Sequence, residues 1–489
     1  MELSGNDELE RAALACALDV AGEDAAARAH VHGFHSYPAR MHPTTARVFI
    51  ERLSAPRGVV LDPFCGSGTV LVEGCLAGRR VVGIDANPLA IELTWLKTRG
   101  STSEERSQLL ETARSVVRSA DDRRKRRAGA THRYGPEDVA LFDPHVLLEL
   151  DGLRAALRRV DVEWARRALA LVLSSILVKV SRQPGDTSRE RGERRLRAGF
   201  TLELFRRKAE ELARRLAEFQ SLVAGHPSRG APTSHPLGSP SVRLGDARRL
   251  EGVERASIDL VVTSPPYPGT YDYLEHHAAR LRWLELDASG FAEMELGARR
   301  HLERLSYGAA LARFTSELGA CLSSMSRTLA PSGRIVILLA DSVIQKKPVH
   351  GDRLIRELVP SADLEITTIG SQQRAHFHGP SAGAFDRIPR REHAIVCRRR
   401  IAGGPKAAPS NTVVPVTGML RRPTLGPGCE PGAMSHTDLP LVSVRVATPE
   451  DPRLWPSFLA PAPRVWQIEP SGGRLSRDFA SHAGKRQPR

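Results

Sequence analysis

A glycine-rich turn lies between two apolar runs near the start of the chain, and its residue types are typical of a ligand-binding loop. The turn reads Asp62-Pro63-Phe64-Cys65-Gly66-Ser67-Gly68-Thr69. Gly66 and Gly68 permit a tight backbone that a ligand can approach closely. Asp85 follows Gly66 by 19 residues, at the end of the next apolar run, where a carboxylate can accept hydrogen bonds from ribose hydroxyls. The third glycine of the dinucleotide fingerprint is replaced by Leu71, and no Lys-Ser/Thr pair closes the turn, so NAD and P-loop sites are disfavoured.

A second segment suited to chemistry follows the apolar run 259–263 and reads Ser264-Pro265-Pro266-Tyr267. Two consecutive prolines end a strand rigidly and remove two backbone donors, which leaves nearby carbonyls free to accept hydrogen bonds from an amino group. The Tyr267 ring offers a flat face for stacking. A stiff acceptor site beside an aromatic ring suits a nucleobase that is turned out of its helix and presents an exocyclic amine.

Together the two segments resemble the motifs of S-adenosylmethionine-dependent amino-methyltransferases that act on DNA. The resemblance covers residues 31–95 and 240–400. It implies S-adenosylmethionine as cofactor and double-stranded DNA as partner. It also implies a setting in DNA methylation and restriction-modification, with a separately encoded restriction or defence partner. The serine in the catalytic motif is typical of cytosine-N4 enzymes in this family, and adenine-N6 methylation is the alternative.

The resemblance assigns residues to a catalytic and a cofactor-binding group. The catalytic group is Ser264, Pro265, Pro266 and Tyr267. The cofactor-binding group is Tyr37, Pro38, Asp62, Pro63, Phe64, Gly66, Ser67, Gly68, Thr69, Asp85 and Asp246. Tyr37 and Pro38 belong to a segment similar to the one that packs beside the methionine part of the cofactor. Asp246 resembles the acid that contacts the cofactor's adenine.

The expected mechanism needs no covalent enzyme intermediate. An aromatic amine is a weak nucleophile because its lone pair is delocalised into the ring. Hydrogen bonds from the amine to Ser264 Oγ and to the Pro265 carbonyl would favour a pyramidal nitrogen, which then attacks the sulfonium methyl group in line. A cytosine-C5 enzyme would need a cysteine nucleophile after a proline, and Cys65 lies inside the glycine turn, so that class is disfavoured.

Two other hypotheses about the function stay open. Some guanosine-N2 tRNA methyltransferases share the glycine turn and a Pro-Pro-Tyr motif, but usually with aspartate before the prolines and an RNA-binding front domain. A non-catalytic nucleic-acid-binding module on the same fold is disfavoured because both motifs are intact. No metal is expected, since the clustered histidines lack regular ligand spacing and a cysteine partner. These are His30, His32, His35 and His42. His276 and His277 either line the substrate cleft or occupy polar helix positions.

The elements expected around the motifs belong to one α/β fold. Apolar runs at 58–62 and 81–85 flank a helical stretch, which predicts a strand-helix-strand unit and a parallel sheet. Further strand signals occur at 242–244, 258–263, 334–339, 364–369 and 393–397. We therefore predict a class I, Rossmann-like methyltransferase fold with a mixed seven-stranded sheet, a helical insertion and an irregular C-terminal tail.

The chain is expected to divide into five segments. They are an N-terminal helix and linker (1–30), the cofactor-binding half of the core (31–100), a basic helical insertion (101–240), the catalytic half (241–400) and a partly disordered Pro-rich tail (401–489). The tail holds 14 of the 34 prolines, which argues against regular structure there. The segment that reads the DNA sequence could be the insertion, residues 280–310 or the tail.

The formal charge of +15 over 489 residues suits a polyanionic partner, although arginine enrichment can also be a compositional bias. The insertion contains 27 Lys and Arg against 19 Asp and Glu. Its basic clusters at 123–127 and 182–197 could clamp phosphates, or they could form a solvated helical face. Six scattered cysteines, no apolar signal core and no bilayer-length apolar run predict a cytoplasmic protein with no membrane partner.

Overall fold

The computed structural model describes residues 1–20, 23–183, 185, 192, 195–225, 240–374, 383–400 and 414–415. The predicted tail, 401–489, therefore lies outside the described residues except for one two-residue strand, and most of the basic cluster at 182–197 lies outside them as well. Among the described residues, every helix is too short or too polar to cross a bilayer.

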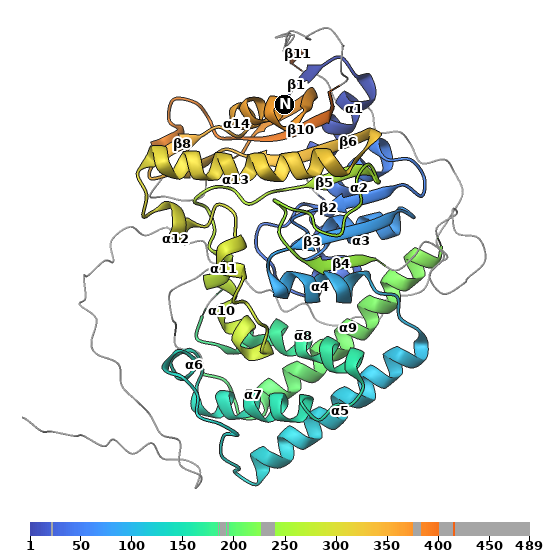
Figure 1. Ribbon diagram of the computed structural model, residues 1–489. Helices are drawn as coiled ribbons and strands as arrows, with labels where there is room; N and C mark the ends of the chain where they lie inside the picture. The colour runs from blue at the N-terminus through green and yellow to red at the C-terminus, as the bar shows by residue number, and fades with distance from the viewer. Residues whose placement is uncertain are drawn as a thin grey trace, which may run out of the picture.

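A mixed sheet organises the molecule (Figure 1). Five parallel strands lie side by side in the order β4, β3, β2, β5, β6, with bounds Ser241–Leu244, Arg80–Asp85, Val59–Asp62, Ile258–Thr263 and Leu329–Ala340. In chain order this is 3-2-1-4-5, the doubly wound arrangement whose ligand crevice lies at the carboxyl ends of the strands where the order reverses. That point falls between β2 and β5, which end directly before the two motifs.

The far side of the sheet is antiparallel and extends beyond the seven predicted strands. β10 (Arg391–Arg399) lies between β6 and β9 (Leu364–Gln373) and runs antiparallel to both, which confirms the mixed methyltransferase-like fold. β1 (Glu2–Gly5) adds to β9, and β11 (Val414–Pro415) adds to β1, so the sheet has nine strands. Strands this short, one of them largely polar, give no periodic signal in the sequence.

Two layers of helices cover the sheet because neighbouring strand residues point to opposite faces. Val60 packs into one apolar cluster, whereas Val59 and Leu61 pack into another. The first cluster includes helices α1 (Glu8–Leu18), α2 (Pro43–Leu53), α3 (Thr69–Leu76) and α4 (Pro88–Thr98). The second includes α13 (Tyr307–Thr328) and α14 (Gly351–Leu358).

The described part of the insertion is helical and shares the core of the first layer. Its helices are α5 (Ser103–Lys125), α6 (Pro136–Leu141), α7 (Pro144–Leu157), α8 (Glu163–Val180) and α9 (Phe200–Ala224). Their buried residues, such as Leu109, Val172 and Leu212, belong to the same apolar cluster as Val60 and Leu71. In Figure 1 these helices form a layer next to α4 and to α10 (Tyr273–Leu284), and contacts of α8 with both helices confirm that placement.

Short elements complete the structure. Residues 26–33 form two 3-10 turns, η1 (Ala26–Arg28) and η2 (His30–Gly33). After α10 come α11 (Phe291–Met294) and α12 (Arg299–Leu302). The remaining short elements are the hairpin β7 (Ser342–Ile344) and β8 (Lys347–Val349), and the turn η3 (Val359–Ala362).

Candidate functional site

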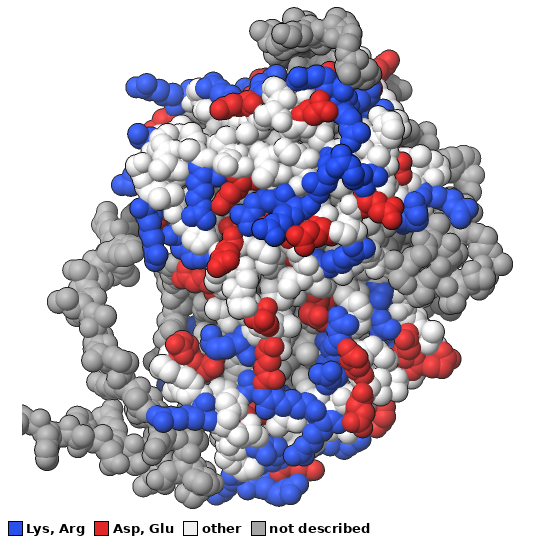
Figure 2. Space-filling model, viewed as in Figure 1, with Lys and Arg blue, Asp and Glu red and all other residues white. Residues whose placement is uncertain are grey.

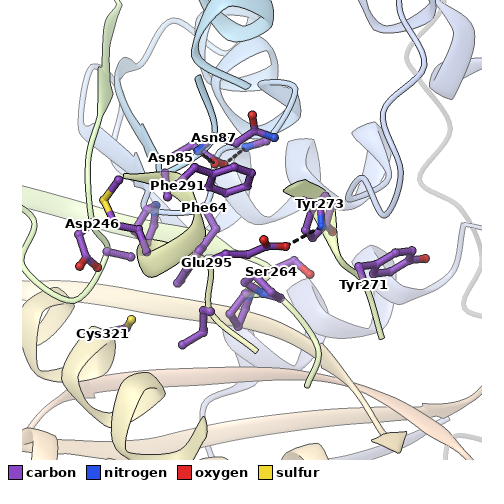
Figure 3. Close-up of a pocket in the computed structure, with 18 of the residues that line it drawn as sticks. Phe64, Asp85, Asn87, Asp246, Ser264, Tyr271, Tyr273, Phe291, Glu295 and Cys321 are labelled. Carbon is purple, nitrogen blue, oxygen red and sulfur yellow. Dashed lines mark hydrogen bonds between the residues drawn. The ribbon is translucent and has the colours of Figure 1, made fainter. Parts of the chain in front are cut away.

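Two adjoining hollows open at the carboxyl ends of the parallel strands, and Figure 3 shows the larger one. The larger has a volume of about 830 Å³ when the space that opens to solvent is included. Ten predicted site residues line it: Tyr37, Pro63, Phe64, Gly66, Asp85, Asp246, Ser264, Pro265, Pro266 and Tyr267. The smaller hollow shares Tyr37, Phe64, Gly66 and Ser264 with it and adds Asp62, Ser67 and Thr69. Pro38 and Gly68 line neither hollow.

The glycine turn holds its shape through contacts that only glycine allows. Gly66 and Gly68 have positive φ angles of 50° and 84°. A Cβ at Gly68 would lie 2.9 Å from Thr94 Oγ1 on α4, so this glycine serves close helix packing and does not face the cavity. A Cβ at Gly66 would come 3.3 Å from the Tyr37 ring. Ser67 Oγ is buried beside the smaller hollow without a hydrogen-bond partner in the structure, which fits a site that takes a polar ligand.

Asp85 is held at the end of β3 by backbone amides. The N–H groups of Gly66 and Asn87 donate to its two carboxylate oxygens over 2.8 and 2.9 Å. Burial raises the pKa of Asp85 to about 6, against the lowering effect of these backbone donors. Asn87 also caps α4 by accepting from the Leu89 N–H, and its side-chain amide donates to the Tyr37 hydroxyl over 3.3 Å. The acid is therefore fixed where ribose hydroxyls would need an acceptor.

Asp246 follows β4, the strand next to the one that ends at Asp85, and lines the same cavity (Figure 3). The Arg248 Nε donates to both of its carboxylate oxygens at 2.9 Å, and the Arg248 backbone N–H donates at 2.8 Å. Arg248 also lines the cavity, although the sequence motif pointed only to the acid. This pairing fixes the orientation of the Asp246 carboxylate at the β4 end of the cavity.

A hydrogen bond joins the two motifs directly. Thr263, the last residue of β5, donates its hydroxyl to Asp62 over 2.8 Å, and burial raises the pKa of Asp62 to about 7. The chain then enters the Ser-Pro-Pro-Tyr segment, where Ser264 Oγ and the Tyr267 hydroxyl lie 3.5 Å apart. Burial raises the pKa of Tyr267 to about 12, so the phenol stays protonated at neutral pH. The strand end thus presents an acceptor and an aromatic ring to the same cavity.

The cavity has a further wall that the motifs did not identify. Tyr271 and Tyr273 follow Tyr267 closely in the chain, and Tyr273 stacks on Tyr37 with ring centroids 6.1 Å apart. The Tyr273 backbone N–H donates to Glu295 over 2.6 Å, as Figure 3 shows. The other lining residues outside the predicted set are Ala39, Ala86, Asn87, Gly245, Ala247, Phe291, Met294, Leu296 and Cys321. Neither these tyrosines nor residues 291–296 belong to a sequence motif.

The histidines considered in the sequence lie in two separate parts of the structure, one beside Tyr37 and the other between η2 and α3. His277 does not line the larger cavity; it is fully buried behind Tyr37, where its Nδ1 accepts from the Asn87 amide over 2.9 Å. His30, His32 and Glu73 lie close enough to share a metal ion. However, His32 Nε2 and Glu73 Oε1 are 2.7 Å apart, a hydrogen bond, whereas two ligands of one tetrahedral zinc are about 3.3 Å apart. The pair joins η2 to α3.

Ion pairs occupy much of the basic surface of the insertion. On α9, Arg206 pairs with Glu210 and Arg214 with Glu218, at 2.6 and 2.8 Å. On α5, both Arg124 and Lys125 pair with Asp121. Figure 2 shows basic and acidic side chains interleaved over the lower helices on this face. This arrangement favours a solvated helical face over a continuous phosphate clamp on these helices.

Comparisons with known proteins match parts of the chain. Residues 18–95 match the family of DNA methylases of the N6/N4 type. Type II methyltransferase M.MvaI of Kocuria varians is 44% identical over 70 residues, which are 14% of this chain and 15% of that protein. The tRNA (guanine(10)-N2)-dimethyltransferase of Methanothermobacter thermautotrophicus is 42% identical over 69 residues, which are 14% of this chain and 20% of that protein.

Among solved structures, the rRNA methyltransferase aviRa from Streptomyces viridochromogenes matches with a TM-score of 0.31 and 13% identity, over 78% of this chain and 94% of that one. The chain thus spans only 15 and 20% of the length of the two curated relatives. Over residues 18–95, the chain is therefore similar to DNA methylases of the N6/N4 type.

Proposed function

We propose that the protein is a DNA methyltransferase that modifies the exocyclic amine of a base turned out of the duplex, with cytosine N4 as the target. The observation that carries the proposal is the shared cavity. Ser264 and Tyr267 line it together with Gly66, Asp85 and Asp246. A base and an adenosine-containing cofactor can therefore meet in one hollow at the switch point of the sheet.

In this proposal the residues of the catalytic segment hold and orient the base. The amine donates its two N–H groups to Ser264 Oγ and to the Pro265 carbonyl, while Tyr267 stacks on the ring. S-adenosylmethionine, when bound, supplies a methyl group on a positively charged sulfur. The rigid prolines fix the acceptors before the base arrives, so positioning contributes most of the rate.

The cofactor half holds its ligand by the residues that face the cavity from β2, β3 and β4. Asp85 accepts the ribose hydroxyls, Asp246 faces the adenine, and the Gly66 backbone permits close approach. Ser67 Oγ gains a hydrogen-bond partner from the methionine part. Tyr37 covers the ligand from the opposite side, since its ring borders both hollows.

The cytosine-N4 target rests on Ser264, and adenine N6 is the alternative within the same chemistry. An RNA substrate is the second candidate, because one relative, similar over 69 residues, is named a tRNA (guanine(10)-N2)-dimethyltransferase. A separately encoded restriction or defence partner is proposed from the type II methyltransferase named among the relatives.

Transfer of a labelled methyl group tests the proposal. The full chain is incubated with methyl-labelled S-adenosylmethionine and, separately, with duplex DNA of mixed sequence and with total tRNA. We expect label in DNA only, and its loss in Ser264→Ala. Label in tRNA alone would establish the RNA reading, and label in neither acceptor from a protein that binds the cofactor would contradict methyl transfer to nucleic acid.

A further inference from the structure

The segment that brings Tyr37 to the cavity, residues 28–36, is held largely by helices outside the cofactor half. Within that half, a hydrogen bond joins His32 Nε2 to Glu73 on α3, and Arg40 Nη1 donates to the His32 carbonyl over 2.7 Å. The opposite side of the segment faces α8, α9 and α10. The insertion therefore contributes to the wall that Tyr37 forms.

Two cationic side chains of helix α9 donate hydrogen bonds to backbone carbonyls of the segment. Arg215 Nη1 donates to the carbonyls of Arg28 and His30 over 2.8 and 2.5 Å. Lys208 Nζ donates to the Phe34 carbonyl over 3.0 Å and lies 5.3 Å from the centre of the Phe34 ring. Lys208 is only 5% exposed, so this charge is committed to the contact and does not face solvent. Glu211 accepts from both cations over 2.7 Å and fixes them in place.

Helix α8 adds a buried hydrogen bond two residues before Tyr37. His35 Nδ1 lies 2.6 Å from the Ser36 carbonyl, so Nδ1 carries the proton, and Nε2 accepts from the Ser174 hydroxyl over 2.9 Å. Burial lowers the pKa of His35 well below its ordinary value, which keeps the ring neutral and this tautomer in place. Both side chains are at most 2% exposed. Arg280 on α10 donates to Ser36 Oγ over 3.1 Å.

The same insertion also holds the helix that begins at the catalytic end. Trp283 Nε1 on α10 donates to Asp138 of α6 over 3.0 Å, and Arg282 pairs with the same carboxylate at 2.7 Å. Helix α10 begins with Tyr273, which stacks on Tyr37. The insertion thus contacts both elements that bring these two rings together.

We propose that α8 and α9 of the insertion position Tyr37 for cofactor binding, with Ser174, Lys208 and Arg215 as the positioning residues. The inference rests on the proposed function in so far as it takes the cavity as the cofactor site. The ion pairs on the exposed faces of α5 and α9 agree with a bracing role, since these cations are paired with acidic side chains of their own helices. The role differs from the phosphate clamp suggested by composition.

Cofactor affinity measured by calorimetry tests the inference without any methyl acceptor. Lys208→Met keeps the length of the side chain and removes its hydrogen bond to the Phe34 carbonyl. We expect the dissociation constant for S-adenosylmethionine to rise about tenfold, the loss typical of a charge-assisted hydrogen bond. Lys208→Arg should restore affinity to within about threefold, because its guanidinium can donate to the same carbonyl. Ser174→Ala is a second, milder variant and should shift affinity in the same direction.

Arg214→Ala is the matched control, because Arg214 lies on the same helix but its side chain is 61% exposed and pairs only with Glu218 among the described residues. We expect its cofactor affinity to equal that of the wild type. Melting temperatures identify variants that fail to fold, and saturating cofactor should restore turnover in Lys208→Met if its defect is in cofactor positioning. Unchanged affinity in both folded Lys208→Met and Ser174→Ala would overturn the inference. Absence of cofactor binding by the wild type would instead contradict the proposed function.

Discussion

The cofactor half lines the cavity and the helical insertion supports it. The sequence predicts the roles of residues in the first region but not in the second. In the cofactor half, Gly66 and Asp85 take part in hydrogen bonds or backbone conformations that few other residues could supply. In the insertion, Ser174 and Lys208 reach the cavity only through a neighbouring segment. A residue that contacts a ligand must be of a particular type. A residue that only holds such a residue in place can be replaced by many other types.

The family match likewise covers part of the cofactor half and none of the insertion. It covers residues 18–95 and ends before α5 begins at Ser103. The insertion nevertheless shares one apolar core with the matched segment, so the end of the recognisable sequence is not a structural boundary. The family match therefore ends inside one continuous apolar core, and it leaves out Asp246 and residues 264–267, which line the same cavity.

The largest effect is expected at the catalytic segment. Tyr267→Ala removes the ring proposed to hold the base, and stacking contributes on the order of 1–3 kcal/mol per base, so turnover should fall roughly a hundredfold. The dissociation constant of S-adenosylmethionine should change less than about threefold. Single-turnover methylation and calorimetry measure the two quantities. Tyr267→Phe keeps the ring and should retain most activity; equal losses of activity and cofactor affinity in Tyr267→Ala would assign Tyr267 to cofactor binding.

The second-largest effect is expected at Asp85, the acid at the end of β3. Asp85→Asn should weaken cofactor binding about thirtyfold, because an amide replaces a charged acceptor for ribose hydroxyls. In the wild type, burial raises the pKa of Asp85 to about 6, so affinity should be constant above that pH and fall as the carboxylate is protonated below it. Calorimetry between pH 5 and 8 checks this, and Asp85→Asn should lose the pH dependence. A wild-type affinity that is flat across the range would contradict the role of the carboxylate.

Where the insertion contacts α10, we expect a substitution to lower mainly the stability of the protein and to have only a small effect on cofactor affinity. Asp138→Ala leaves the buried Trp283 N–H and Arg282 without their acceptor, which should lower the free energy of unfolding by about 2–3 kcal/mol. Denaturant unfolding measures this change. Cofactor affinity in the folded variant should fall by no more than about fivefold, because α8 and α9 still hold the segment before Tyr37. A loss of affinity as large as in Asp85→Asn would give α6 a more direct role than support.

The smallest effect is expected on the exposed face of the insertion. Arg206→Ala breaks a surface pair with Glu210 and should change the free energy of unfolding by less than about 0.5 kcal/mol. Binding to duplex DNA should also be unchanged, including its dependence on salt. A salt slope that falls by about one unit would show that Arg206 contacts a phosphate and would restore the clamp interpretation.

The sequence was sufficient for the parts of the fold with strong local patterns. The runs ending at Asp62, Asp85 and Thr263 are strands of one sheet, and the fold class is confirmed. The two-residue strand β11 and the polar strand β1 lack such patterns and extend the sheet unexpectedly. Gly68 fits the motif but packs against Thr94 and does not line the cavity, because a glycine in a turn can serve helix packing as well as ligand approach.

The rest of the site depends on contacts that no local pattern encodes. His35 and Ser174 are 139 residues apart in the chain, yet they form one buried hydrogen bond. Glu295, which follows the short helix α11 and belongs to no motif, accepts from the backbone of Tyr273 at the start of α10. Such partners become visible only when the tertiary structure brings their segments together.

The identity of the methylated nucleoside is the most direct test of the central claim. Duplex DNA is methylated by the full chain with labelled S-adenosylmethionine, digested to nucleosides and resolved by mass and retention time. The account predicts N4-methyldeoxycytidine, absent in Ser264→Ala. N6-methyldeoxyadenosine would contradict the target assigned from Ser264, and unmodified DNA from a protein that binds the cofactor would contradict the account of the shared cavity.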